Sequence, residues 1–384
     1  MKYFLIAGEA SGDLHGGRLI AALRKADSEA EFCFLGGDYM EKASGVKPVV
    51  HYKKMAYMAF SEVLRHLSDI YGNMSTARKT LTDFRPDAVI LIDYPSFNLK
   101  IAKYAHSKGI PAYYYISPKV WAWKEWRVKE IKKYIRKVFS ILPFETSFYA
   151  RYGVEADYVG NPTANEIAEF KQDTPGYMAF VEKHGIRDRR PMIALLPGSR
   201  AGEIRNNLPV MYKAAARFAN FQPVVAAAPN IDKEFYSQSL RKKGIEANPL
   251  LIEGDTFALV ANSAAALVTS GTATLETAVI GTPQVVCYRA NGSKLAYKLF
   301  ERILKVKFVS LPNLIAGKEV VKELLLHECT PENAAKEIEP LLYDSPQWRA
   351  MSEGYKEVTA KLGNMDSGET AARLMLDDLK TLKR

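Results

Sequence analysis

Acidic residues gather where the first predicted strand turns into a helix. Glu9 and Asp13 stand around Ser11 and Gly12 in IAGEASGDLHGG, and Asp93 ends a second apolar run, AVILID. The carboxyl ends of parallel strands meet at one edge of a sheet, so these acidic groups are expected at one site. A carboxylate there can take a proton as general base, with Asp93 the first choice and Glu9 the second. Ser11, Gly12 and Asp13 are predicted to contact the substrate, although Ser11 or Asp13 could instead only cap the helix.

A second strand–turn–helix unit lies about 190 residues later, in the segment IALLPGSRAGEI. Gly198, Ser199 and Arg200 form its turn, just before the predicted helix. The turn has neither the GxxxxGK[ST] spacing of a nucleotide-hydrolase loop nor GxGxxG. Free backbone N–H groups at a helix start, together with a guanidinium, suit a diphosphate. We therefore predict that these three residues hold a diphosphate.

A third anion-binding turn follows the apolar run AALVT. In SGTATLE, Gly271, Thr272, Ala273 and Thr274 open a helix, and Glu276 lies in its first turns. A carboxylate in that place can accept hydrogen bonds from two ribose hydroxyls. These residues are therefore predicted to bind the nucleotide part of an activated substrate.

No Asp-x-Asp pair occurs anywhere in the chain. Enzymes that hold a nucleotide sugar through a metal usually need that pair to coordinate the ion. Here helix dipoles and Arg200 would neutralise the diphosphate, at about 0.3–1 kcal/mol for a dipole and about 1.5–3 kcal/mol for a charge-assisted hydrogen bond. We expect a metal-independent reaction that uses no cofactor.

Strand and helix signals alternate along the whole chain. Buried parallel strands are predicted from apolar runs at residues 3–7, 88–92, 112–116, 192–196, 223–228, 265–268 and 284–287. Amphipathic stretches between them predict helices on both sheet faces, which is an α/β fold. Two such units in 384 residues predict two Rossmann-like domains facing a cleft. We expect a first domain over 1–165, a second over 190–345, and C-terminal helices over 346–384 that cross back onto the first.

The composition is that of an ordinary globular protein, with 48% hydrophobic and 25% charged residues. Cys33, Cys287 and Cys329 are few and scattered, which predicts a reducing compartment and no zinc site. The N-terminal apolar run is short and interrupted by Glu9, unlike a signal peptide, and no run is long enough to span a membrane. We expect a cytoplasmic protein.

The net charge of +10 is partly concentrated in one segment. Between Lys119 and Lys137 there are eight Lys or Arg and only two Glu, interleaved with Trp121, Trp123, Trp126 and Tyr134. Such a segment can bind nucleic acid or an anionic membrane surface, or can be a solvated helix face with its Trp residues packed inward. Because no RRM, KH or helix-turn-helix signature is present, nucleic acid is not expected as a partner.

A helix predicted over residues 57–74 carries a wide apolar face. Its stripe, at spacings of three and four residues, is most simply core. Met55, Met58 and Val63 widen this face, and cations flank it. A wide apolar face rimmed by cations is typical of membrane contact. We predict that these three residues touch a membrane.

Six segments of the chain together resemble the lipid-A-disaccharide synthase family: GEASGD, YISPKVWAWKEWRVKEI, LPFE, LPGSRAGEI, SGTATLE and VSLPNLIAGKEVVKELL. They run from residue 8 to about residue 329, so the resemblance covers nearly all of the chain, and the tail after Pro331 departs most. The resemblance implies a GT-B fold. It also implies that Asp93, Glu9, Arg200 and Asn313 matter for activity, with Asn313 in a substrate-binding role.

The resemblance further implies the reaction and its partners. The family is an inverting glycosyltransferase of Gram-negative bacteria that joins UDP-2,3-diacylglucosamine to 2,3-diacylglucosamine 1-phosphate. Its products are a β-1′,6-linked disaccharide 1-phosphate and UDP. Acylated substrates imply a peripheral location on the cytoplasmic face of the inner membrane, against the inner leaflet, and a homodimer stays open. The alternative is another GT-B enzyme for UDP-GlcNAc, a 2-epimerase or a peptidoglycan glycosyltransferase, which would not need the Trp-rich basic segment.

Overall fold

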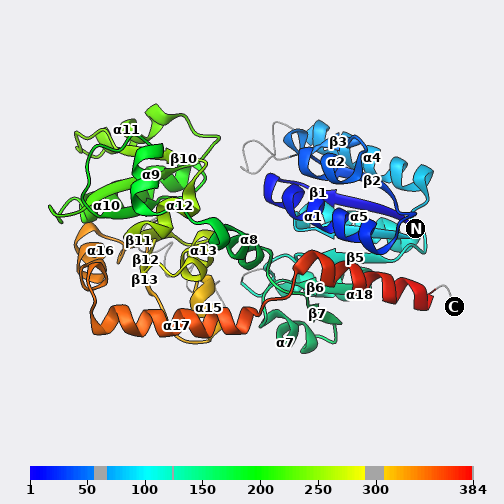
Figure 1. The fold of residues 1–384 in the computed structure, drawn as a ribbon. Helices are drawn as coiled ribbons and strands as arrows, with labels where there is room; N and C mark the ends of the chain where they lie inside the picture. The colour runs from blue at the N-terminus through cyan, green and yellow to red at the C-terminus, as the bar shows by residue number, and fades with distance from the viewer. Residues whose placement is uncertain (56–66, 123–124, 290–306, 383–384) are drawn as a thin grey trace. The chain divides into compact units, whose positions relative to one another are not determined.

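The computed structural model describes residues 1–55, 67–122, 125–289 and 307–382, which form two compact units. Unit 1 comprises Met1–Pro162 with Asn364–Arg384, and unit 2 comprises Thr163–Gly363. Each unit is built on one parallel sheet with helices packed against it (Figure 1). The predicted α/β class, with two parallel-sheet domains, is confirmed.

Unit 1 contains a seven-stranded sheet in the order β3-β2-β1-β4-β5-β6-β7, in which every neighbouring pair is parallel. Its strands are β1 (Lys2–Ala7), β2 (Glu31–Gly36), β3 (Val50–His51), β4 (Ala88–Ile92), β5 (Ala112–Tyr115), β6 (Lys137–Ser140) and β7 (Ala156–Tyr158). Its helices are α1 (Ala10–Ala26), α2 (Asp38–Ser44), α4 (Leu67–Phe84), α5 (Pro95–Ser107), α6 (Val128–Tyr134), α7 (Glu145–Ala150) and α18 (Ser367–Leu382).

The strands of unit 1 are buried on both faces. Along β1, Tyr3, Leu5 and Ala7 pack in one core cluster with side chains of α1 and α18. Phe4 and Ile6, which alternate with them, are fully buried on the opposite face. Each such apolar side chain stabilises the fold by about 1.5–3 kcal/mol. Burial on both sides explains why these strands are uninterrupted apolar runs in the sequence.

Unit 2 contains a six-stranded parallel sheet in the order β10-β9-β8-β11-β12-β13. Its strands are β8 (Met192–Leu196), β9 (Gln222–Ala227), β10 (Leu250–Glu253), β11 (Ser263–Thr269), β12 (Gln284–Tyr288) and β13 (Lys322–Leu325). Its helices are α8 (Pro162–Phe170), whose first residue belongs to unit 1, α9 (Tyr177–Lys183), α10 (Ala201–Ala215), α11 (Lys233–Arg241), α12 (Thr256–Ala261), α13 (Thr272–Ile280), α15 (Leu311–Ala316), α16 (Pro331–Ile338) and α17 (Pro346–Leu362).

Side chains of β8 also divide between two core clusters. Ile193 and Leu195 pack with residues of α10, α11 and α16, whereas Met192, Ala194 and Leu196 pack with residues of α9 and α12. The sheet of unit 2 is therefore covered on both faces in the same way as that of unit 1.

Only the last of the two C-terminal helices belongs to unit 1. Helix α18 packs against α1, and Asp378 on it accepts hydrogen bonds from Tyr113 at 2.5 Å and from Arg136 at 2.6 and 2.8 Å. The predicted return of the chain onto the first domain is thus confirmed for α18. It is wrong for α17, because Met351 and Tyr355 of that helix lie in the core of unit 2.

The strand order reverses once in each sheet. In unit 1 the reversal lies between β1 and β4, and in unit 2 between β8 and β11, strands that are neighbours in space but not in sequence. Ligands of open α/β sheets bind outside the carboxyl ends of the strands at such a switch point. The predicted site residues are therefore expected at these two switch points.

Candidate functional site

The structure brings Glu9 and Asp93 together at the switch point of unit 1. Asp93 directly follows β4, and Glu9 is the N-cap residue of α1, just beyond β1. Burial, and next the negative charge of Glu9, raise the pKa of Asp93 to about 6, while Lys119 acts in the opposite direction. A hydrogen bond between the two carboxyl groups also contributes to this shift. Asp93 is thus a base whose strength lies close to neutral pH.

Asp93 is held in a strained backbone conformation. Asp93 and Tyr94 have φ angles of 44° and 47°, in the left-handed region. The side chains of Asn98 and Tyr114 each donate a hydrogen bond to the Asp93 carbonyl at 2.7 Å. The Tyr94 ring covers Gly8 so closely that a Cβ atom at Gly8 would overlap it. Such strain costs about 1–3 kcal/mol per residue and persists only where the surroundings over-determine it, so this loop places Asp93 rigidly.

Asp13, a predicted substrate contact, has a structural role in the folded chain. It is 1% exposed, and its carboxylate accepts hydrogen bonds from the backbone N–H groups of Gly37, Tyr39 and Met40 at 2.7–3.1 Å. These are the free donors at the start of α2, so Asp13 caps a neighbouring helix rather than its own. Gly12 is buried against Ala7.

Ser11 is exposed beside the acidic pair. Its hydroxyl donates a hydrogen bond to Glu9 at 3.0 Å. Of the three predicted substrate contacts in this segment, Ser11 is therefore the one that is both accessible and next to a carboxylate.

The turn predicted to hold a diphosphate lies at the switch point of unit 2, but its N–H groups have a partner. The carboxylate of Glu203 accepts hydrogen bonds from the backbone N–H groups of Ser199 at 3.1 Å and Arg200 at 3.3 Å. Gly198, with a φ of 111°, packs against Glu203, and a Cβ atom there would overlap it. An anion entering this turn would have to displace the Glu203 carboxylate.

The guanidinium of Arg200 remains accessible. Its side chain is 66% exposed, with Nη1 3.4 Å from Glu203. A long ion pair of this kind is worth about 0–1 kcal/mol at an exposed site, so it would not prevent Arg200 from turning toward a ligand.

The segment 270–276 divides into structural and accessible residues. Thr274, a predicted substrate contact, is fully buried, and its hydroxyl donates to the Gly271 carbonyl at 2.7 Å. Ala273 packs against a core cluster. Gly271 is the N-cap residue of α13 and is followed by the exposed Thr272.

Glu276 is the carboxylate of this second site. Burial, and next the negative charge of Glu166, raise the pKa of Glu276 to about 7, while a hydrogen bond with Thr272 opposes the shift. Its charge state therefore changes in the physiological pH range. A ligand hydroxyl that donates to this carboxylate would favour the ionised form.

Asn313, a predicted substrate contact, has a structural role. It is fully buried, and its Nδ2 donates to the Val321 carbonyl at 2.9 Å and to the Glu323 carboxylate at 2.8 Å. Its Oδ1 accepts from the backbone N–H groups of Val320 at 2.6 Å and Val321 at 2.9 Å. An asparagine side chain has two donors and two acceptor positions, so no capacity is left for a ligand. Asn313 instead joins α15 to the start of β13.

Asn207 was missed by the sequence analysis, although it organises the switch point of unit 2. It is fully buried, and its Nδ2 donates to the Thr269 hydroxyl at 3.1 Å and to the Pro197 carbonyl at 3.4 Å. Its Oδ1 accepts from the backbone N–H of Arg289 at 2.8 Å. One side chain thus ties together the ends of β8, β11 and β12. The only signal in the sequence is a polar residue within the apolar stripe of a predicted helix.

A buried carboxylate in the LPFE segment was also missed. Glu145 is 1% exposed and accepts hydrogen bonds from Trp121 at 2.9 Å and from Ser140 at 2.5 Å. Burial raises the pKa of Glu145 to about 7, against the effect of these two donors. Trp121 is therefore packed inward, whereas Trp126 is 60% exposed and Trp123 lies outside the described residues.

The predicted membrane face falls largely outside the described residues, which include neither Met58 nor Val63. Met55 is 1% exposed, so its side chain is buried rather than presented to a membrane, and its carbonyl accepts a hydrogen bond from Tyr94 at 2.8 Å. None of the helices in the described part of the chain has the length and apolarity needed to cross a bilayer.

Comparison with solved structures agrees with the fold. Two UDP-GlcNAc 2-epimerases superpose along the whole chain, one from Methanocaldococcus jannaschii, in complex with UDP-GlcNAc and UDP, and one from Neisseria meningitidis, bound to UDP-GlcNAc. Their TM-scores are 0.65 and 0.63, at 15% and 16% identity, and each comparison covers at least 98% of both chains. At this identity they show a shared GT-B fold alone.

Comparison with sequences is more specific. A family model described as lipid-A-disaccharide synthetase matches residues 3–375. Lipid-A-disaccharide synthases from Myxococcus xanthus and Syntrophus aciditrophicus are each 38% identical to this chain, covering 98% of it and 97% of their own length. The motif order that suggested the resemblance is therefore part of a match over nearly the full length. The chain belongs to the lipid-A-disaccharide synthase family of glycosyltransferases.

Proposed function

We propose that this chain is an inverting transferase that joins UDP-2,3-diacylglucosamine to 2,3-diacylglucosamine 1-phosphate, releasing UDP and a β-1′,6-linked disaccharide 1-phosphate. The observation that carries the proposal is the pair Glu9–Asp93 at the unit 1 switch point, within a chain that matches this family from residue 3 to 375. Inversion needs one base, placed to take the proton of the attacking hydroxyl.

Asp93 is the residue we assign to that base. A carboxylate with a pKa near 6 is mostly ionised at pH 7 to 8, yet holds a proton more firmly than an ordinary aspartate. Its rigid loop restricts the directions from which the acceptor 6-hydroxyl can approach. Glu9, which shares the site, would orient the acceptor, and it is the second candidate for the base.

The donor nucleotide is assigned to unit 2. Arg200 would stabilise the negative charge that develops on the leaving UDP, together with the helix start that follows the turn at 197–200. Glu276, with Gly271 and Thr272, would hold the ribose. The absence of an Asp-x-Asp pair from the sequence supports a reaction that needs no metal ion.

A peripheral position on the cytoplasmic face of the inner membrane is proposed from the substrates. Moving acyl chains into water costs about 0.8 kcal/mol per CH₂, so an enzyme that meets its substrates at the inner leaflet avoids most of that cost. The net charge of +10 favours an anionic surface.

Product analysis tests the proposal. The purified chain is given UDP-2,3-diacylglucosamine with acylated and non-acylated acceptors, with and without EDTA. Disaccharide 1-phosphate from the acylated acceptor alone, at equal rates in both buffers, is the expected result. Turnover of UDP-GlcNAc without acylated sugars would instead favour a 2-epimerase, and loss of activity in EDTA that Mg²⁺ restores would show that a metal is used.

A further inference from the structure

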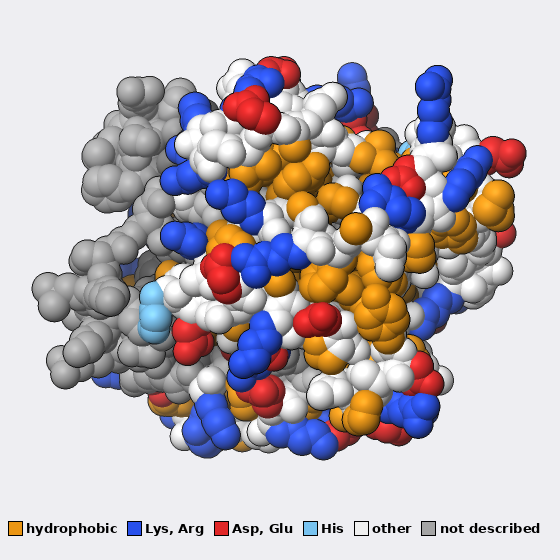
Figure 2. Space-filling model, turned by 90° about the vertical axis from the view of Figure 1, so that its left-hand side faces the viewer, with side chains coloured by type: hydrophobic (Ala, Val, Ile, Leu, Met, Phe, Trp, Pro, Cys, Tyr) orange, Lys and Arg blue, Asp and Glu red, His pale blue; other side chains and the backbone are white. Residues whose placement is uncertain are grey.

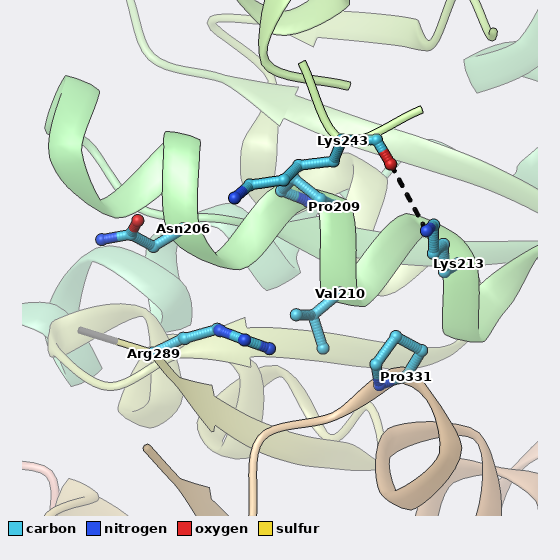
Figure 3. Close-up of a pocket in the computed structure, with 7 residues that line it drawn as sticks. All are labelled: Asn206, Pro209, Val210, Lys213, Lys243, Arg289 and Pro331. Atoms are coloured by element: carbon cyan, nitrogen blue, oxygen red, sulfur yellow. Dashed lines mark hydrogen bonds between the residues drawn. The ribbon is translucent and has the colours of Figure 1, made fainter. Parts of the chain in front are cut away.

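A cationic pocket lies in unit 2, outside the residues assigned to the donor. It has a volume of about 310 Å³ and is lined by Asn206, Pro209, Val210, Lys213, Lys243, Arg289 and Pro331 (Figure 3). Four of them lie on one face of α10, because they are spaced three or four residues apart: Asn206, Pro209, Val210 and Lys213. The others come from the segment after α11, the end of β12 and the start of α16. None of these lining residues belongs to the turn at 197–200 or to the segment 270–276.

The three cations of the pocket have no acidic partner in the described part of the chain. Among the residues that the structure describes, neither Lys213, Lys243 nor Arg289 pairs with a carboxylate, and no Asp or Glu lines the pocket. Lys213 donates to the Lys243 carbonyl at 3.4 Å, and Nη1 of Arg289 donates to the Cys329 carbonyl at 3.2 Å. Both charged groups are thus tied to backbone and keep other donors available.

The floor of the pocket is apolar. Pro209 and Val210 are buried residues of α10, and Pro331 begins α16. Figure 3 shows Val210 between the side chains of Lys243 and Arg289. Figure 2 views the molecule from the side on which α10, α11 and α16 lie, and charged side chains of both signs lie among hydrophobic ones across that face. Within the pocket the three cations repel one another, and a bound anion would relieve that repulsion.

We propose that this pocket binds a phosphate monoester group, separately from the donor nucleotide. A phosphate offers several acceptor oxygens, which match two ammonium groups and a guanidinium edge. The apolar floor would accept the group that carries the phosphate. Two kinds of ligand carry such a phosphate group: a lipid with a phosphate headgroup and a soluble phosphorylated molecule.

The pocket is connected to the switch point of unit 2 by one residue. The backbone N–H of Arg289 is bonded to Asn207, whose amide also reaches the Pro197 carbonyl. An anion held by Arg289 therefore lies two hydrogen bonds from the turn that precedes Arg200. Binding in the pocket is expected to leave UDP affinity within about twofold, since Asn207 is already held by all three strand ends.

A titration with inorganic phosphate tests the site in the full-length chain. Binding is measured by calorimetry in the presence of saturating UDP. Saturating UDP occupies the donor turn, so that the remaining phosphate binding reports on the pocket. The Lys213→Ala/Lys243→Ala variant should bind phosphate at least about tenfold more weakly, which is the loss expected for charge-assisted hydrogen bonds. The control Lys242→Ala/Lys336→Ala removes the same charge from exposed positions outside the pocket and should bind as wild type does.

Two further measurements complete the test. Crystals soaked in tungstate should show anomalous density between Lys243 and Arg289. Vesicles of phosphatidylcholine with phosphatidic acid, but not of phosphatidylcholine alone, should sediment wild type better than the pocket variant if a lipid supplies the phosphate. Phosphate binding without that difference would assign a soluble ligand. Equal phosphate affinity in the pocket variant and wild type, or tungstate absent from the pocket, overturns the proposal.

Discussion

Three features fix the position and the basicity of Asp93. It lies in the left-handed backbone region, its carbonyl accepts two side-chain hydrogen bonds, and its carboxylate is buried beside another. The positive φ angle and the buried charge cost free energy in the folded state, whereas the two hydrogen bonds hold the strained loop in place. Retaining all three at a switch point is what an active-site residue requires, because the strain fixes the position and the burial adjusts the basicity.

Asp93→Asn should abolish transfer while increasing stability. The raised pKa of about 6 means that ionised Asp93 destabilises the fold above pH 6, and that this cost disappears as the pH falls toward the ordinary value of 3.8. Asn carries no charge and tolerates a positive φ angle. At pH 7.5 urea denaturation should show a free energy of unfolding higher by roughly 1–3 kcal/mol.

The control for this variant is Asp83→Asn, at an exposed helix position where only an i,i+4 pair is lost. Its activity and stability should match those of wild type. A kcat equal to that of wild type in Asp93→Asn would show that the base is elsewhere, with Glu9 the next to test.

For the wild-type enzyme, kcat/KM should fall as the pH drops below about 6, because the protonated carboxyl of Asp93 cannot accept a proton.

Glu276 should make UDP binding depend on pH near neutrality. The ionised carboxylate accepts hydroxyl hydrogen bonds, and its pKa of about 7 in the free protein means that it is partly protonated at pH 7. UDP affinity should therefore rise as the pH increases from 6 to 8. The Glu276→Gln variant should bind UDP more weakly and without this change. A wild-type affinity that stays constant over the same range contradicts the role.

At the scale of elements, helix ends and strand ends are held by buried polar side chains. Asp13 holds the start of α2, Asn313 joins α15 to β13, and Asn207 ties three strand ends together. Glu323 accepts hydrogen bonds from the backbone N–H groups of Val309 and Ser310 before α15. These residues orient the loops at the switch points through hydrogen bonds within the chain.

Asp13→Ala should affect stability rather than substrate binding. The substitution leaves three N–H groups at the start of α2 without their acceptor, and each unsatisfied buried donor costs about 1–3 kcal/mol. The free energy of unfolding should fall by at least about 2 kcal/mol, with KM unchanged for the protein that remains folded. Ser11→Ala, in the same segment but exposed, should have normal stability. A raised KM with normal stability in Asp13→Ala would restore Asp13 as a substrate contact.

At the scale of the whole molecule, the chain crosses between units twice. It passes from unit 1 into unit 2 after Pro162 and returns at Asn364, so that α18 completes the core of unit 1. Ala371, Met375 and Leu379 of that helix are buried with side chains of β1 and β5. Unit 1 therefore cannot complete its core until the end of the chain has been synthesised.

Asp378→Asn should loosen unit 1 selectively. Asp378 accepts a bidentate pair from Arg136 and a hydrogen bond from Tyr113, and Asn keeps only one acceptor oxygen. The loss of a charge-assisted pair should cost about 1–3 kcal/mol. Hydrogen exchange should accelerate in β5 and α18 and remain unchanged in the strands of unit 2. Asp377→Asn, one residue earlier and 62% exposed, is the matched control and should exchange as wild type does.

The sequence predicted best those strands that can be recognised from a short run of neighbouring residues. Seven apolar runs coincide with β1, β4, β5, β8, β9, β11 and β12, because strands buried on both faces must be apolar at every position. The runs that were missed, among them β2, β6 and β13, start or end with charged residues or are only four residues long. The order of the motifs also identified the family, because it is a property of nearly the whole chain and does not depend on the role of any single residue.

The roles of individual polar residues were decided only by the tertiary structure. Asp13 and Thr274 stand in the same motifs as Glu9 and Thr272, and Asn313 stands in the motif at 309–325. Nothing local distinguishes a ligand contact from a cap at these positions. Burial and partners from distant strands or helices make that distinction, as for Asn207 and Glu145. The sequence by itself determined the two parallel sheets, the turns at their switch points and the family. Tertiary structure decided which side chains remain accessible there, because hydrogen-bonding capacity is used up by neighbours that are remote along the chain.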